Sequence, residues 1–228
     1  MFDNRRYLHF LMKQQARLST TDETHDSYGF PLALRAGVYP AHPDLTGSPS
    51  SIIARLPPVM EGLDVLDIGT GSGVIAITAA LRGARVVACD VDQAAVELAR
   101  RNAERNGVAS SVDIRQSDLF SGLPSRTFDI VTANLWFPIK VWGFRADRKA
   151  CLDIQDRFFR EVRQWLKPNG TAILASADFA DNDAVVKGLT RHDIRAHRKT
   201  LPLRHDAGQL PMNWHSFSFD ANGQPVTL

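Results

Sequence analysis

The sequence predicts an α/β fold, a doubly wound and mostly parallel seven-stranded sheet with an N-terminal lid or collar. Three observations predict it. From Leu63 onward, short apolar runs alternate with stretches that have apolar residues at helical spacing, which is typical of β-α-β units. A glycine-rich stretch follows the first apolar run directly. The 228 residues are 44% hydrophobic and 23% charged, which fits a globular protein and excludes disordered, collagen-like and coiled-coil classes.

Residues 1–60 differ from the rest of the chain and are predicted to form a helical lid or collar that is not an independent domain. Arg5 to Leu18 has apolar residues at helical spacing, and Ser50 to Leu56 predicts a second short helix. Between them, Thr20 to Ser50 is rich in glycine and proline, which indicates turns. All three tyrosines (Tyr7, Tyr28, Tyr39) lie here, and a closing lid would exclude water from a bound ligand. Residues 61–228 are expected to form the main domain.

The remaining elements follow in order. Strands are expected at residues 64–68, 84–90, 111–115, 128–133 and 171–175, with weaker candidates near 194–203 and 214–219. Helices are expected at residues 73–82, 92–106, 149–166 and 181–189. Asp92 is predicted to cap the second of these helices, and Gly107 to end it in a left-handed conformation. Pro168-Asn169-Gly170 is predicted to end the third.

The glycine-rich stretch, Asp67-Ile-Gly69-Thr70-Gly71-Ser-Gly73, lies between the first strand and the first helix of this domain. Ligands of such sheets bind beyond the carboxyl ends of the strands, where glycines allow close approach of the backbone and a helix N-terminus offers free N–H groups. The spacing differs from the dinucleotide fingerprint G-x-G-x-x-G, because position 74 is valine. This spacing weakens the prediction of a nicotinamide oxidoreductase.

The pattern resembles motif I of the class I S-adenosylmethionine (SAM) methyltransferases, a Rossmann-like fold, over residues 60 to about 176. The resemblance implies that SAM is the cofactor and that Asp67, Gly69, Thr70, Gly71 and Gly73 form its loop. It implies that Asp90, which ends the second strand beside Val91, holds the ribose hydroxyls. It also implies that Asp118 holds the adenine amino group and that Leu119 gives a backbone N–H to the ring.

A second motif follows the fourth strand, where Asn134-Leu135-Trp136-Phe137 resembles the Asn-Pro-Pro-Tyr or Asn-Pro-Pro-Phe of glutamine, adenine and guanine N-methyltransferases. Leu135 and Trp136 replace the two prolines. The resemblance implies that the Asn134 carboxamide orients the acceptor nitrogen beside the cofactor and that Phe137 stacks on the target. Trp136 is predicted to join them as a wall of the site. The segment Ala36 to His42 also resembles the stretch before motif I in the small-domain group of this family.

Charge and composition indicate which classes of partner the sequence favours. The net charge of +2 favours neither an anionic nor a cationic partner. Basic residues gather in Arg191 to Arg204, but a solvated edge strand is the preferred interpretation, so a nucleic-acid partner is not favoured. The histidines lack metal-ligand spacing, and no metal is expected. No apolar run reaches the roughly 18 to 20 residues of a membrane span, and two distant cysteines predict a reducing, cytoplasmic setting.

The predicted function is SAM-dependent methyl transfer to a nitrogen or oxygen of a small molecule or a protein side chain. One alternative is an enzyme of the same fold that transfers or cyclises the aminocarboxypropyl arm of SAM and releases methylthioadenosine. Another is a non-catalytic module that binds SAM or nucleic acid. The acceptor and the oligomeric state are left open by the sequence.

Overall fold

A computed structural model describes residues 23–35, 37–43, 46–135, 148–178, 180–204 and 211–228. The predicted helix over Arg5 to Leu18 therefore lies outside the described residues, as do Tyr7, Trp136 and Phe137. No helix in the described part of the chain is long and apolar enough to cross a membrane.

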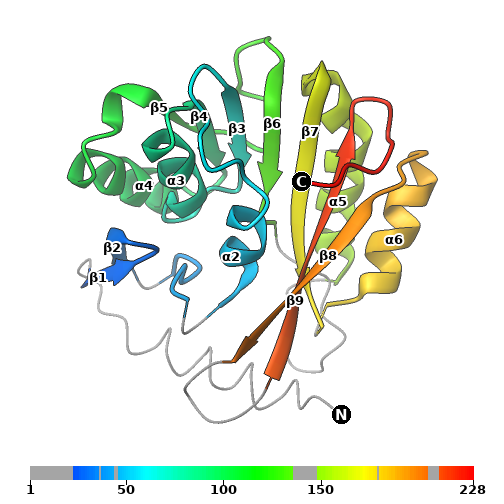
Figure 1. Ribbon diagram of the computed structural model, residues 1–228, viewed down its shortest axis with the longest axis horizontal. Helices are drawn as coiled ribbons and strands as arrows, with labels where there is room; N and C mark the ends of the chain where they lie inside the picture. Colours follow the sequence, from blue (N-terminus) through cyan, green and yellow to red (C-terminus); the bar gives the residue numbers. More distant parts are fainter. Residues whose placement is uncertain (1–22, 36, 44–45, 136–147, 179, 205–210) are drawn as a thin grey trace.

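Seven strands form one sheet in the order β5-β4-β3-β6-β7-β9-β8, which confirms the predicted fold class. Neighbours are parallel from β5 to β7, and β9 is antiparallel to both β7 and β8. The strands are β3 (Asp64–Ile68), β4 (Arg85–Asp90), β5 (Val112–Gln116), β6 (Phe128–Ala133), β7 (Leu166–Ala177), β8 (His197–Arg204) and β9 (Pro211–Asp220). The strand order reverses between β3 and β6, whose arrowheads point to the bottom of Figure 1. Ligand sites of open sheets lie at such a switch point.

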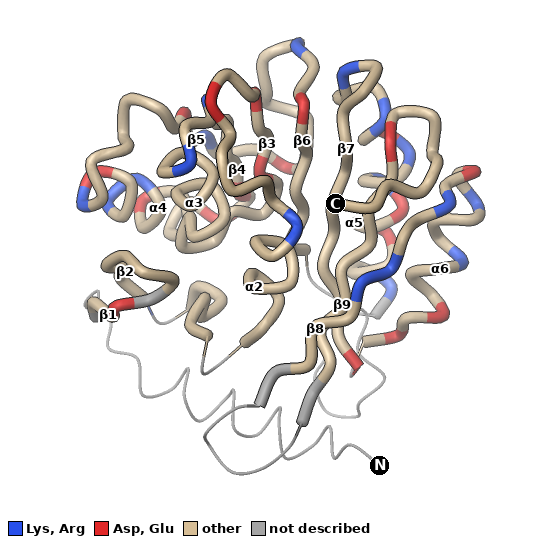
Figure 2. The backbone as a smooth tube through the Cα atoms, viewed as in Figure 1, with Lys and Arg blue, Asp and Glu red and all other residues tan. Residues whose placement is uncertain are grey.

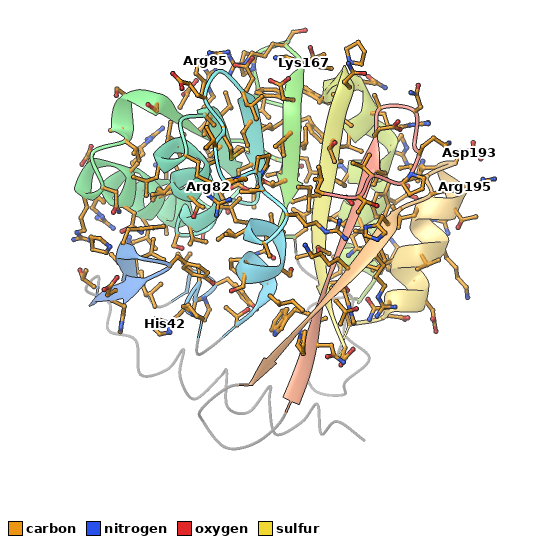
Figure 3. The ribbon with its side chains drawn as sticks, in the orientation of Figure 1. His42, Arg82, Arg85, Lys167, Asp193 and Arg195 are labelled. Carbon is orange, nitrogen blue, oxygen red and sulfur yellow. The ribbon has the colours of Figure 1, made fainter. Side chains whose placement is uncertain are left out.

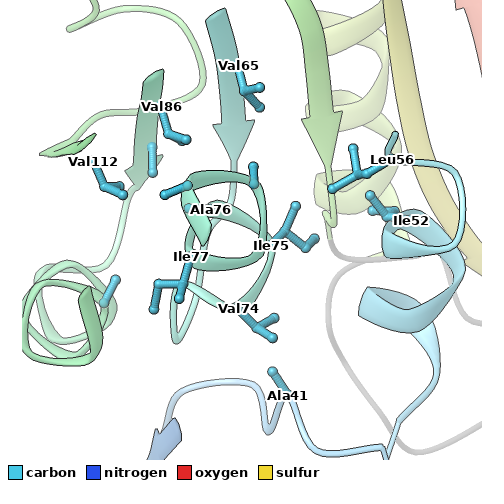
Figure 4. Close-up of a cluster of buried hydrophobic side chains, with 14 of the residues drawn as sticks. Ala41, Ile52, Leu56, Val65, Val74, Ile75, Ala76, Ile77, Val86 and Val112 are labelled. Carbon is cyan, nitrogen blue, oxygen red and sulfur yellow. The ribbon is translucent and has the colours of Figure 1, made fainter. Parts of the chain in front are cut away.

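Helices cover both faces of the sheet, as predicted. The helices are α2 (Ser48–Ile53), α3 (Val74–Leu81), α4 (Gln93–Arg105), α5 (Arg148–Glu161) and α6 (Asn182–Arg191), with short 3₁₀ turns η1 (Ala109–Ser111) and η2 (Val162–Trp165). Residues of α2, α3 and α4 share one buried cluster with the sheet, part of which Figure 4 shows. Residues of α5 and α6 form a second cluster on the opposite face.

Local capping predictions are confirmed at α4. Asp92 accepts a hydrogen bond from the Ala94 N–H at 2.9 Å, and Gly107 has a φ of +69°. The predicted end of the next helix is wrong, because α5 ends at Glu161 and Pro168 to Gly170 lie inside β7. The pairing of β6 with β7 shifts register there, from Phe128 opposite Leu166 to Ile130 opposite Thr171. A proline fits such a bulge, because bulged residues do not take part in the hydrogen bonds between the strands and proline has no N–H to donate.

The turn-rich stretch contains an unpredicted hairpin, β1 (Glu23–Ser27) and β2 (Phe30–Leu34). Tyr28 and Gly29 form its turn with φ values of +59° and +83°. Two positive φ values are typical of the two-residue turns that join antiparallel strands. The hairpin lies below α3 and α4 in Figure 1, beyond the carboxyl ends of β3 and β4.

Arg55 joins the segment after α2 to the last two strands. Its side chain is buried and donates to the hydroxyls of Ser216 and Ser218, at 2.6 and 2.7 Å, and to the carbonyls of His197 and Ser216, both at 2.9 Å. Its Nη1 also lies 3.3 Å from His197 Nδ1. None of these partners is a carboxylate, so hydrogen bonds alone offset the cost of burying the charge.

Charged residues also gather at the amino edge of the sheet, at the top of Figure 2. Lys167 contacts Asp64 at 2.9 Å and Asp129 at 2.7 Å, and Arg85 contacts Asp64 at 3.0 Å. Arg85 and Lys167 are labelled in Figure 3. This network lies at the end of the sheet opposite the carboxyl edge, so it belongs to the fold and not to a ligand site there.

Candidate functional site

A cavity opens at the carboxyl edge of the sheet, beside the switch point between β3 and β6. Four segments that follow strands contribute to its wall, and the segment after the hairpin closes it. Its main polar lining residues are Tyr39, Thr70, Ser72, Asp90, Asp92, Ser117, Asp118 and Asn134. Of the predicted cofactor residues, Gly69, Thr70, Gly71, Asp90, Val91, Asp118, Leu119 and Asn134 line this cavity.

The glycine-rich loop has the open geometry that the sequence predicts. Gly69, Gly71 and Gly73 have φ values of +72°, +55° and +86°, a region that favours glycine. A Cβ atom on Gly69 would lie 3.1 Å from Leu135 Cδ2, and one on Gly71 would meet only Val38 Cγ1, at 4.0 Å. Gly73 does not line the cavity; its missing side chain lets α3 approach Ala99 of α4, 3.1 Å from a Cβ placed there.

Asp67 lies beneath the loop and not in the cavity wall. It is fully buried, and its two carboxylate oxygens accept hydrogen bonds from the hydroxyls of Thr70 and Thr132, both at 2.7 Å. Burial, with the nearby charge of Asp90 as a smaller cause, raises the pKa of Asp67 to about 6. Its direct contacts therefore hold the loop to β6.

Asp90 ends β4 and holds the loop from the cavity side. Its Oδ2 accepts the Gly71 N–H at 2.9 Å, and its Oδ1 accepts the Asp92 N–H at 3.0 Å. Burial raises the pKa of this carboxyl, although backbone hydrogen bonds from Asp92, Gly71 and Val91 lower it. A carboxylate can accept about four hydrogen bonds, so Asp90 retains capacity for a ligand hydroxyl.

Asp118 and Leu119 form the wall after β5. Asp118 is exposed and pairs with Arg157 of α5, with 3.0 Å between Nη2 and Oδ2. Leu119 has a φ of +53°, an uncommon conformation for a residue with a side chain. Its carbonyl accepts from the Ser117 hydroxyl at 3.0 Å, which helps to hold this strained turn.

Asn134 follows β6 and lies at the switch point, next to the loop. Its N–H donates to the Ile68 carbonyl at 3.4 Å, and its own carbonyl oxygen would lie 3.6 Å from a Cβ on Gly69. The structure thus brings Asn134 to the same cavity as Asp90 and Asp118. The other two predicted acceptor-site residues, Trp136 and Phe137, lie outside the described residues.

Several lining residues were missed by sequence reasoning. Ile154 on α5 and Val38 after the hairpin are apolar residues that nothing in the sequence distinguishes from core. Ser72 could have been predicted from the sequence, because it lies inside the glycine motif. The residue lines the cavity, while its hydroxyl is buried and has no hydrogen-bond partner among the described residues.

The arrangement suits a polar organic ligand better than a metal. Among the described residues, no group of three His, Cys, Asp or Glu side chains is placed to hold a metal ion. Asp90, Asp92 and Asp118 give the wall an acidic character, which favours a ligand with positive charge and hydroxyl donors. The fit to SAM rests on these carboxylate acceptors and on the open glycine loop.

Comparison with known proteins supports this interpretation. Residues 35–198 match the family described as methyltransferase small domain. The ribosomal protein L11 methyltransferase of Dictyoglomus thermophilum is 34% identical over 149 residues, 65% of this chain and 42% of that relative. The enzyme of the same name from Thermosipho africanus is 49% identical over 115 residues, 50% of this chain and 37% of that relative. The aligned regions thus span less than half the length of these relatives.

Solved structures share the fold at low identity. The T. thermophilus 16S rRNA N2 G1207 methyltransferase, in complex with AdoMet and guanosine, has a TM-score of 0.63 and 22% identity, and the match covers 88% of this chain and 50% of that one. The ribosomal protein L11 methylase of Lactobacillus delbrueckii subsp. bulgaricus has a TM-score of 0.53 and 23% identity, with 75% and 74% covered. With the family match over residues 35–198, we conclude that the chain belongs to the methyltransferase small domain family.

Proposed function

We propose that the chain is a SAM-dependent methyltransferase whose acceptor is a nitrogen or oxygen of a protein side chain or a small molecule. One observation carries the proposal: the glycine loop, Asp90, Asp118 and Asn134, which follow four different strands, line one cavity. In this proposal residues 61–228 bind the cofactor, and residues 1–60 form a collar that completes the pocket.

The charges of the cavity support SAM over a nicotinamide dinucleotide. SAM brings an electrophilic methyl group on a sulfonium cation, whereas a dinucleotide brings an anionic pyrophosphate. Asp90 and Asp92 in the wall and Asp67 beneath it would attract the cation and repel the pyrophosphate. In our assignment, Asp90 binds the ribose hydroxyls and Asp118, with the Leu119 N–H, binds the adenine.

Asn134 is assigned to the acceptor. It lies at the carboxyl end of β6, next to the loop that would hold the methionine part of the cofactor. The carboxamide oxygen would accept a hydrogen bond from an N–H or O–H group of the methyl acceptor. This hydrogen bond would aim the lone pair of the methyl acceptor at the methyl group, and such positioning supplies much of the rate. A neutral amide would also favour positive charge developing on nitrogen without taking a proton itself. Trp136 and Phe137 are proposed to wall this position.

The names of the relatives support a protein side chain as the methyl acceptor over a small molecule. The two enzymes compared above are both named ribosomal protein L11 methyltransferase. The match to a guanosine-bound rRNA methyltransferase rests on 22% identity and supports only the fold, so we do not propose RNA. Leu135 and Trp136 replace the two prolines of the motif, so the identity of the methyl acceptor is decided by the following experiment.

The proposal is tested by identifying the products. Purified protein is incubated with SAM alone and with a cell extract, and the nucleosides are identified by mass spectrometry. We expect S-adenosylhomocysteine only with extract, and fractionation then leads to the acceptor. Methylthioadenosine from SAM alone would replace methyl transfer by reaction of the aminocarboxypropyl arm. Calorimetry that detects binding of NADH but not of S-adenosylhomocysteine would overturn the proposal entirely.

A further inference from the structure

A buried asparagine connects the N-terminal hairpin to the glycine loop. Asn102 lies in α4 and is fully buried. Its Oδ1 accepts the Ala33 N–H at 2.8 Å, and its Nδ2 donates to the Ala33 carbonyl at 3.0 Å. The same Nδ2 donates to the Ser72 carbonyl at 2.9 Å. One carboxamide thus holds both backbone groups of a strand residue and one backbone group of the cavity loop.

The two segments that Asn102 joins both lead to lining residues of the same cavity. Ser72 lies in the loop and lines the cavity. Ala33 belongs to β2, which leads into the lining residues Gly37, Val38 and Tyr39. Ala33 and Val38 also pack with Ala95 and Leu98 of α4 in one small cluster. The position of one segment is therefore coupled to the other through one side chain.

We infer that Asn102 is a positioning residue for the cofactor, because it fixes the Ser72 carbonyl and so ties the hairpin to the loop. Asn102 does not line the cavity, so it acts on the ligand only through these two segments. The inference rests on the proposed function. It makes the hairpin part of the binding site and not only a cover over it.

The chain offers a matched control. Asn106, the residue that caps the C-terminus of α4, donates to the Pro31 carbonyl of the same hairpin at 2.8 Å and to the Asn102 carbonyl at 2.8 Å. It holds the hairpin without touching the loop. Asn106→Ala therefore removes the hairpin contact with Pro31 and leaves the Ser72 contact in place. Asn102→Ala instead removes the hairpin contacts with Ala33 together with the Ser72 contact.

The first measurement is calorimetric titration of S-adenosylhomocysteine into the full chain, below the melting temperature of each variant. We expect Asn102→Ala to weaken binding about tenfold and Asn106→Ala by less than about threefold, because only the first frees the loop. A purely structural role would lower the melting temperature of Asn102→Ala without this difference in Kd. Equal Kd values in the two folded variants would overturn the inference.

A second measurement uses the wild type and keeps the test decisive if Asn102→Ala does not fold. Amide hydrogen exchange is followed by NMR with and without S-adenosylhomocysteine. Because the Ala33 N–H is held by Asn102, we expect the ligand to slow its exchange together with that of the loop amides. Protection of the loop without any change at Ala33 would refute the coupling. No binding by the wild type would instead refute the proposed function, so the two failures are distinguishable.

Discussion

Replacing Asp90 by asparagine is the sharpest test of the proposed cofactor site. The carboxylate accepts the backbone N–H groups of Gly71 and Asp92, at 2.9 and 3.0 Å, and also that of Val91. Its remaining acceptor capacity is assigned to the ribose hydroxyls. An amide has one oxygen, so its NH₂ group must face at least one of these backbone donors, and one hydroxyl also loses its acceptor.

The expected loss of affinity follows from the hydrogen bonds that Asp90→Asn removes. Removing a charged acceptor from a hydrogen bond costs about 1.5–3 kcal/mol, which corresponds to a Kd weakened roughly 10- to 150-fold. Calorimetric titration with S-adenosylhomocysteine measures the change. Asp90→Asn also frees a loop N–H, so the melting temperature is recorded beside the Kd.

Asp92→Asn is the matched control, because it removes the same charge from the same cavity wall. Asp92 caps α4 through the Ala94 N–H, and asparagine is an equally good cap. We expect Asp92→Asn to bind the ligand nearly as well as the wild type. Equal weakening in both variants would mean that only the overall charge matters. Wild-type affinity in Asp90→Asn would refute the ribose assignment.

The remaining predictions concern the acceptor, the loop and pH. Asn134→Ala should leave the Kd for S-adenosylhomocysteine unchanged and lower turnover of the fractionated acceptor; unchanged turnover would remove Asn134 from the site. Gly73→Ala should lower stability by about 2 kcal/mol or more in denaturant unfolding, because a Cβ there meets Ala99 at 3.1 Å, while Gly107→Ala, with open space, should lose only about 1 kcal/mol. The pKa of Asp67 is raised to about 6 in the folded protein, so the stability present below the unfolded pKa of about 4 falls as pH rises through 6. Asp67→Asn should make this slope shallower and gain on the order of 2 kcal/mol above pH 7, while the raised pKa of Asp90 leaves a smaller slope of the same sign. A slope as steep as that of the wild type in urea titrations of the variant would contradict the buried charge.

Elements determined by their own residues could be predicted from the sequence. The Asp92 cap and the Gly107 end of α4 depend on hydrogen bonds within one turn, and both are confirmed. The strands β3 and β6 occupy the predicted residues, because short apolar runs between turns carry that signal. The meeting of Asp90, Asp118 and Asn134 at one cavity follows, since parallel strands end at the same edge.

Features determined by contacts distant in sequence could not be predicted. Pro168 is a typical helix stop, but here it lies in a bulge whose position is decided by β6. The polar strand β1 has no hydrophobic alternation, and β2 is held by Asn102, 69 residues after Ala33. Asn102 itself left a weak signal, an amide on the apolar face of α4 among Ala99 and Ala103, but its partners become visible only in the structure.

The buried Arg55 also constrains when the protein can complete its folding. Its acceptors are contributed by residues 142 to 163 positions later in the chain. During synthesis Arg55 leaves the ribosome long before β8 and β9 exist, so until then its guanidinium stays hydrated and the contacts of α2 with β9 cannot form. Early docking of the N-terminal half is thereby discouraged, and arrival of the final strands becomes the step that closes the molecule. A nascent chain stalled before β9 should accordingly remain sensitive to protease near Arg55.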